Sequence, residues 1–190
     1  MHIQRAFRAI AGGFFVLGWL VPTLFAQFPT IRENHEIEEG HIVRFILIMA
    51  IGAVPSMLVG SYVISKVGSR RLALLSLPIF LIFAACFMIA PSYPLFLLVG
   101  FAIGISTGFF DVSANSQGAL LETVSDRFFL TAIHALFAAG VLVGSILATT
   151  AHYFAVPMPW FFLGLTGVSA LLLWFIYRDF LSFELEKGLS

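Results

Sequence analysis

Asp111 is the one acidic residue deep inside an apolar run of this 190-residue chain. Asn115 follows one helical turn later, so the two side chains share a face of any helix that forms here. Placing a charge at the centre of a bilayer costs about 2.5–3.5 kcal/mol on insertion scales. Because protonation removes that charge, Asp111 is a candidate proton carrier or substrate ligand. The alternative is that Asp111 hydrogen-bonds to a neighbouring helix and only fixes its packing.

Other polar residues interrupt the apolar runs on either side. His134 is a candidate proton relay or ligand for a polar substrate, although a structural histidine near a helix end is an equal alternative. Trp19, Thr23 and Gln27 follow one another at four-residue steps. They form a polar helix edge that is a candidate substrate contact, whereas a Trp at helical spacing also serves packing.

The residues around Asp111 form a stripe about 60° wide on a helix, at about 100° per residue. Its members are Gly100, Gly104, Asp111, Asn115, Gly118 and Glu122, with Gly108 at the margin. Glycines at four-residue spacing let a neighbouring helix approach closely. The stripe therefore predicts that this helix packs tightly and presents an acid and an amide to the interior.

No pairing of nucleophile and base in the sequence predicts an enzyme. The segment Gly104-Ile105-Ser106-Thr107-Gly108 matches the G-x-S-x-G motif, which acts through a strand-turn-helix elbow, whereas here it lies inside an apolar helix. The single cysteine, Cys86, lies in a hydrophobic run and is expected to pack as a small apolar side chain. We expect no metal and no cofactor.

The composition places these residues in a membrane protein. Hydrophobic residues make up 60% of the chain and charged residues 11%, against about a quarter charged in a typical globular protein. A soluble domain could not bury so much apolar surface, so lipid must cover part of it. The net charge of zero shows no basic excess that would indicate nucleic acid as a partner.

Charge-free segments predict six membrane-spanning helices in one all-α domain over residues 1–190. A hydrocarbon core of about 30 Å needs about 20 helical residues. The expected helices cover about 9–29, 44–65, 71–90, 94–122, 127–152 and 159–178. A membrane β-barrel would show short alternating segments instead. The segments 71–90 and 159–178 carry few polar residues and are expected at the periphery, while the other four surround the interior.

Lysine and arginine placement predicts the orientation. With six helices, eight basic residues fall on one side: Arg5, Arg8, Lys66, Arg70, Arg71, Arg127, Arg178 and Lys187. Only Arg32 and Arg44 fall on the other, in a loop that also holds Glu33, Glu36, Glu38 and Glu39. The bias predicts a multi-pass protein of the cell (inner) membrane with both termini in the cytoplasm.

The segment from Gly108 to Gly118, GFFDVSANSQG, with Glu122 after it, resembles the fourth-helix signature of the major facilitator superfamily, in its fucose-permease-like branch. The segment His134-Ala135-Leu136-Phe137-Ala138-Ala139-Gly140 is similar to helix five of that branch. The stretch from Ser61 to Arg71, SYVISKVGSRR, resembles the superfamily's loop between helices two and three, and 14–32 fits the opening. The resemblance covers essentially the whole chain.

The resemblance implies a cytoplasmic gate loop at Ser61, Ser65, Lys66, Gly68, Arg70 and Arg71. Ser61 and Ser65 stand where the family usually has Gly and Asp, and no carboxylate lies in the first helix. The family fold has two six-helix halves, each of three-plus-three inverted repeats. The match of Phe14–Trp19 with Phe96–Phe101 pairs Gly18 with Gly100 and hints at such a repeat.

These features predict the amino-terminal half of a secondary active transporter that works by alternating access, with protons coupled to a small polar solute such as a sugar. Asp111 would couple protons or contact substrate, with Asn115 and His134 lining the cavity. The expected partners are the lipid bilayer, the solute, protons, and a second six-helix half or a second copy. The alternative is a six-helix membrane protein without transport activity, a truncated remnant or an assembly scaffold.

Overall fold

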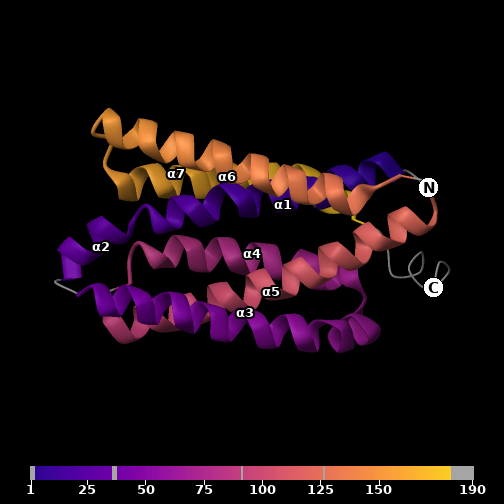
Figure 1. The fold of residues 1–190 in the computed structure, drawn as a ribbon, viewed down its shortest axis with the longest axis horizontal. Helices are drawn as coiled ribbons and strands as arrows, with labels where there is room; N and C mark the ends of the chain where they lie inside the picture. Colours follow the sequence, from indigo (N-terminus) through magenta and orange to yellow (C-terminus); the bar gives the residue numbers. More distant parts are fainter. Residues whose placement is uncertain (1–2, 36–37, 91, 126, 181–190) are drawn as a thin grey trace.

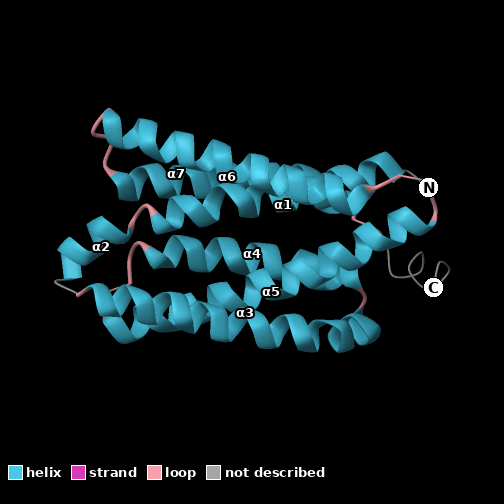
Figure 2. Cartoon of the chain, in the orientation of Figure 1, coloured by secondary structure: helices cyan, strands magenta, loops and turns pink. Residues whose placement is uncertain are grey.

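The computed structural model describes residues 3–35, 38–90, 92–125 and 127–180, and these are built of helices and short connections without a strand (Figure 2). The elements are α1 Ile3–Phe25, α2 Phe28–His35, α3 Glu39–Val67, α4 Ser69–Phe87, α5 Tyr93–Thr123, α6 Phe129–Tyr153, α7 Met158–Ile176 and the 3-10 helix η1 Tyr177–Asp179. Six of them are long and apolar enough to cross a membrane, namely all but α2 and η1. The prediction of an all-α protein with six membrane helices is confirmed.

The first predicted helix, 9–29, has the wrong bounds. It begins at Ile3, because a helix can carry Arg5 and Arg8 beyond the apolar run that defined the prediction. It ends at Phe25, and α2 starts after a turn at Ala26 and Gln27. Pro29 has no N–H to donate to the carbonyl four residues earlier, but it fits the first turn of a new helix. The other five helices end within five residues of their predicted bounds.

The helices run back and forth along the long axis, so that both chain ends lie at one end of the bundle (Figure 1). The basic residues of the α3–α4 junction lie at that same end, whereas α2 and the start of α3 lie at the other. The predicted grouping of the charges at two ends therefore matches the fold. Glu36 and Lys187 lie outside the described residues.

Helices α1 and α6 run side by side in the same direction and touch through their backbones (Figure 1). A Cβ on Gly18 of α1 would strike the carbonyl oxygen of Phe137 in α6. A Cβ on Gly140 of α6 would in turn strike the carbonyl oxygen of Phe15 in α1. Glycine at both positions is what lets the two helices come this close.

Helices α3 and α5 repeat this arrangement in the opposite direction along the bundle. A Cβ on Gly104 of α5 would strike the carbonyl oxygen of Met49, and one on Gly52 of α3 would strike that of Phe101. The contacts thus make Gly104 the counterpart of Gly18 in α1. Gly100, which the sequence match pairs with Gly18, packs against the Phe45 ring instead.

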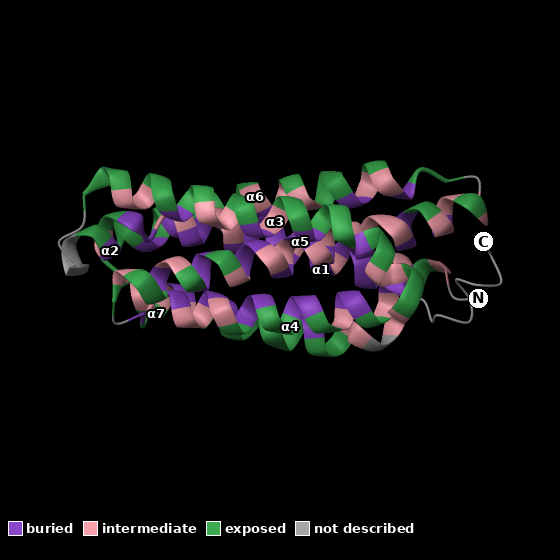
Figure 3. Ribbon diagram, turned by 90° about the horizontal axis from the view of Figure 1, so that it is seen from below, coloured by how far each residue is buried: buried purple, intermediate pink, exposed green. Residues whose placement is uncertain are grey.

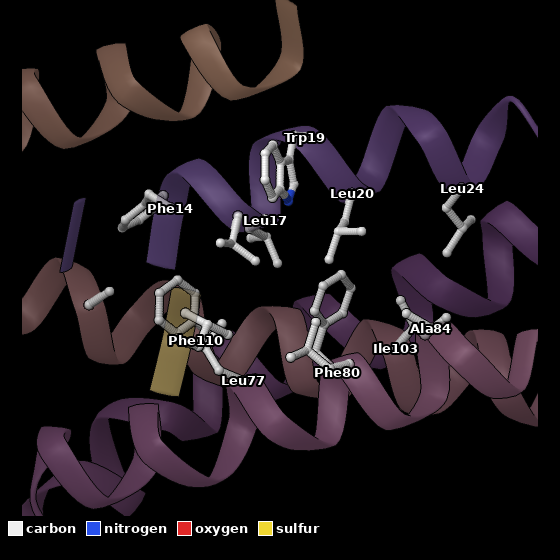
Figure 4. Packing of buried hydrophobic residues seen from close by; sticks show 14 of the residues in the cluster. Phe14, Leu17, Trp19, Leu20, Leu24, Leu77, Phe80, Ala84, Ile103 and Phe110 are labelled. Atoms are coloured by element: carbon white, nitrogen blue, oxygen red, sulfur yellow. The ribbon is translucent and has the colours of Figure 1, made fainter. Parts of the chain in front are cut away.

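The prediction that 71–90 is peripheral is wrong for α4. In the apolar stretch of α4 that is long enough to span a membrane, 44% of the residues are buried, the same share as in α5. In α3 and α6 that share is only 17%. Phe80 and Ala84 of α4 are fully buried, because they face Leu20 and Leu24 of α1 (Figure 4). The uncovered outer faces of the bundle are mapped in Figure 3.

The predicted gate loop is almost wholly helical. Ser65 and Lys66 belong to the last turn of α3, and Arg70 and Arg71 to the first turn of α4. Only Gly68 lies outside a helix; its φ of 85° is one that favours glycine, and its N–H donates to the carbonyl of Ile64 at 2.8 Å.

Small contacts support this junction at the end of α3. The Ser65 hydroxyl donates to the carbonyl of Tyr62 at 2.7 Å, and the Lys66 ammonium lies 5.5 Å from the centre of the Tyr62 ring. Ser61 is exposed and Ser69 is buried. The junction is a tight turn between two helices, so any gate here would move with those helices.

Candidate functional site

Helix α5 holds Asp111 far from water at either end. The helix has 31 residues, about 46 Å at 1.5 Å per residue, so it is longer than the hydrocarbon core of about 30 Å. Asp111 lies twelve residues before its last residue, Thr123, which is about 18 Å along the axis. In a bilayer centred on α5, the carboxyl group of Asp111 would lie near the middle of the hydrocarbon core.

The glycine stripe of α5 changes neighbour at the level of Asp111. Gly108 packs against the backbone of Ala53 and the Ser56 hydroxyl of α3. Gly118, farther along, packs instead against Leu130 and Ile133 of α6. The stripe therefore contacts two different helices, and Asp111 and Asn115 lie between the two contacts, only partly buried.

Asp111, Asn115 and His134 lie near one another in the structure. Asn115 Nδ2 donates to the backbone carbonyl of Asp111 at 2.9 Å, and its amide also interacts with the Asp111 carboxyl group. His134 of α6 lies close enough to Asp111 for their charges to interact. The His134 side chain is exposed at the surface of the chain. The group presents a carboxyl, an amide and an imidazole, each of which can form hydrogen bonds to a polar ligand.

Sequence reasoning missed the aromatic residues that support this group. The Phe14 ring of α1 lies edge-on to the His134 ring, with centroids 5.3 Å apart. It also packs against Phe110, 5.5 Å away, and against Phe137 at 6.4 Å. Phe14 thereby ties α1 to the helices that carry Asp111 and His134. The chain has 22 phenylalanines, so no pattern in the sequence singled this one out.

Trp19, Thr23 and Gln27 lie elsewhere, buried in the packing of α1. The indole Nε1 of Trp19 donates to the Ser169 hydroxyl of α7 at 2.8 Å. The Thr23 hydroxyl donates to carbonyls of its own helix, the Gln27 amide donates from the following turn to the carbonyl of Thr23, and both side chains are fully buried. The structure does not bring these residues to the Asp111 group, and their part in substrate binding stays a prediction.

Glu122, the last member of the stripe, links α5 to the start of α6. Its Oε1 accepts a hydrogen bond from the backbone N–H of Leu130 at 2.8 Å. The bond satisfies one of the N–H groups that have no partner within the first turn of a helix. Glu122 thus fixes where α6 begins, and with it the position of His134.

No arrangement of His, Cys, Asp and Glu side chains in the described residues has the three ligands of a metal site. The group around Asp111 has one acid, one amide and one imidazole, which fits hydrogen bonding to a polar ligand.

Comparison with known proteins gives two relatives, both of them bacterial membrane proteins by name. The uncharacterized transporter y4wD of Sinorhizobium fredii is 26% identical over 181 residues, which is 91% of this chain and 48% of that protein. The membrane protein MosC of Rhizobium meliloti is 26% identical over 136 residues, 72% of this chain and 33% of that protein. No family model matches the chain. With its six apolar helices, the chain is a multi-pass membrane protein that spans about half the length or less of these relatives.

Proposed function

We propose that the chain forms one half of a secondary active transporter, with the Asp111 group as its coupling site. The observation that carries the proposal is the meeting of Asp111, Asn115 and His134 near the middle of the membrane, at a place that is only partly covered. Intramembrane acids are costly, and in membrane proteins they mark ion and substrate pathways.

The packing of the bundle supports a transporter half. The pair α1–α6 and the pair α5–α3 make matching glycine contacts in opposite directions, as two inverted three-helix repeats would. Such repeats would suit a major facilitator half, and the fucose-permease-like branch is the proposed family. The relative named as a transporter is about twice as long as the matched segment, which leaves room for a second half in that protein.

The proposed site needs a second wall. His134 is exposed. In the apolar, membrane-spanning stretches of α6 and α3 only 17% of the residues are buried within the chain, so both helices are largely uncovered. Lipid would leave polar groups on α5 and α6 without partners, at a cost of several kcal/mol for each unsatisfied group. A second six-helix half or a second copy of the chain would cover them and enclose a water-filled path. The protein would lie in the cell membrane with both termini on the cytoplasmic side, in keeping with the eight-to-two bias of basic residues.

In the proposed cycle the Asp111 carboxyl takes a proton from the side where the path is open. Protonation removes the charge of the Asp111 carboxyl and so changes its interactions with Asn115 and with α6, which allows the two helices to shift. A small polar solute, with hydroxyl groups that can pair with the Asn115 amide, binds in the same space. Release of the proton on the other side restores the charge, so that solute and proton move together.

The test is proton entry driven by solutes in vesicles of the host membrane, where the chain is assembled with whatever completes it. A pH dye inside reports proton movement while a panel of sugars, polyols and sugar acids is added outside. We expect at least one solute to drive proton entry and Asp111→Asn to abolish it with normal expression. Ser106→Ala is the matched control, because that hydroxyl only bonds to its own helix.

Two results would contradict the proposal. Proton entry that persists in Asp111→Asn with unchanged pH dependence would make Asp111 a packing residue. Absence of any solute-driven proton movement would favour the alternative, a membrane scaffold without transport. The apolar outer face of α3, with Leu47, Val54 and Leu58 more than half exposed, is the observation that favours assembly.

A further inference from the structure

A hollow lies between α4 and α7, and neither Asp111, Asn115 nor His134 is among its lining residues. Its volume is about 420 Å³. The wall is almost wholly apolar and includes Leu74, Leu77 and Pro78 of α4 and Leu173, Trp174 and Tyr177 of α7 and η1. Because α4 and α7 are membrane-spanning helices, this groove opens at the depth of the hydrocarbon core.

The groove matches one leaflet in length. Its wall on α4 extends from Ala73 to Leu81, eight residues further on, which is about 12 Å along the axis. Half of a hydrocarbon core of about 30 Å is about 15 Å. The groove lies in the half of the membrane nearer the chain termini, since α4 begins and α7 ends at that end of the bundle (Figure 1). A helix of this length and about 10 Å diameter occupies about 900 Å³, too much for the groove.

The end of the groove nearer the termini has the chemistry of a membrane surface. The rings of Trp174 and Tyr177 lie there with centroids 5.8 Å apart, and Trp174 is 67% exposed. Aromatic residues of this kind gather where the hydrocarbon meets the headgroups. Arg71 is exposed in the first turn of α4, and it lies three residues before Leu74 and seven before Pro78 on one helix face.

We propose that this groove binds one acyl chain of an anionic phospholipid, with the headgroup at Arg71. The acyl chain replaces the missing side-chain contacts between α4 and α7. The guanidinium group of Arg71 pairs with the phosphate and with the added negative charge of an anionic headgroup. The site is separate from the transport path, so a bound lipid would hold α4 to α7 without competing with a solute.

Quenching of Trp174 fluorescence by brominated lipids tests the proposal directly. The chain is reconstituted as Trp160→Phe, because Trp160 is 74% exposed at the start of α7 and lipid would quench it as well. Trp19 can stay, because it is 8% exposed, bonded to Ser169 and out of reach of the lipid. Brominated phosphatidylglycerol or brominated phosphatidylcholine is then titrated into unbrominated phosphatidylcholine. We expect the anionic lipid to quench with about fivefold higher relative affinity, as for one basic side chain that faces an anionic lipid.

Two variants assign the headgroup and the acyl chain. Arg71→Gln should remove the preference for phosphatidylglycerol, while Arg44→Gln, an exposed arginine at the other end of the bundle, should keep it. Ala170→Leu, which fills the groove, should weaken quenching by the anionic lipid even where Arg71 is intact.

Other outcomes overturn the proposal. Equal quenching by both lipids would mean that the groove meets bulk lipid only. A preference that survives Arg71→Gln would place the headgroup elsewhere. Quenching no greater than that of a variant with Trp174→Phe would mean that a protein segment fills the groove. These results are independent of transport, so they leave the proposed function as it stands.

Discussion

At the scale of single residues, two sets of polar side chains in the membrane-spanning helices differ in how far they are buried. Asp111 and Asn115 are partly open and bond to each other within α5, and His134 of α6 is exposed and near enough for its charge to interact with Asp111. Trp19 and Ser169 instead close a buried hydrogen bond between α1 and α7. The first group can change partners during a cycle, whereas the second fixes the packing of the bundle.

The Trp19–Ser169 bond gives a residue-scale prediction. Ser169→Ala should lower the free energy of unfolding by about 0.5–2 kcal/mol, since the indole N–H would be buried without an acceptor. The measurement is denaturation of the purified chain in a mild detergent, followed by circular dichroism. Ser145→Ala is the control, because Ser145 is exposed and its loss should change stability by less than about 0.5 kcal/mol. Equal effects of the two changes would show that the bond does not stabilise α7.

At the scale of helices, charge-free length was enough to predict six spans and the ends of five of them. Composition could not show the break at Ala26 and Gln27, because it depends on the missing N–H of Pro29. Nor could polarity rank burial: α4 is nearly all apolar, yet Phe80 and Ala84 lie in the core. Apolar side chains suit both a lipid-facing surface and the protein core, so only the packing of the helices shows which positions are buried.

The candidate site was predictable to a similar degree. Asp111 and Asn115 share a helix face by their spacing alone, and His134 was singled out as a polar residue in an apolar run. The nearness of Asp111 and His134 follows from the way α5 meets α6 and could not be predicted from their spacing in the sequence. The support from Phe14 was hidden among many phenylalanines.

Replacing glycine by alanine should change the free energy of unfolding in different directions inside and outside the close helix pairs. Gly104→Ala and Gly140→Ala should each cost about 1–3 kcal/mol, since the new methyl group would strike backbone that cannot move without parting the helices. Gly164→Ala and Gly167→Ala in α7 should be neutral or stabilising by up to about 1 kcal/mol. A Cβ atom added at either position would have no atom within 4 Å, and alanine has a higher helix propensity than glycine. Unfolding in detergent measures all four. A stabilised Gly104→Ala or Gly140→Ala would refute the backbone contact.

At the scale of the whole molecule, the two ends of the bundle differ in charge and give the orientation. In a Cys86→Ala background, Gly40→Cys at the start of α3 and Phe128→Cys before α6 put a thiol at opposite ends. Phe128 is 85% exposed, and Gly40 is exposed with open space around it. An impermeant maleimide added to intact cells should modify position 40 and spare position 128. The reverse pattern would place both termini outside the cytoplasm.

The central claim is that a water-filled path reaches Asp111 in the assembled protein. The most direct measurement is labelling of Asn115→Cys, one turn from Asp111, by a water-soluble maleimide, because the reactive thiolate forms only where water is present. Right-side-out and inverted vesicles of the host membrane present the two faces, again with Cys86→Ala. Ile79→Cys, at mid-length of α4 and 41% exposed on the side toward lipid, is the control. We predict that the cysteine at position 115 is labelled from at least one side of the membrane, while the cysteine at position 79 is not. If neither position were labelled from either side, the account would be contradicted.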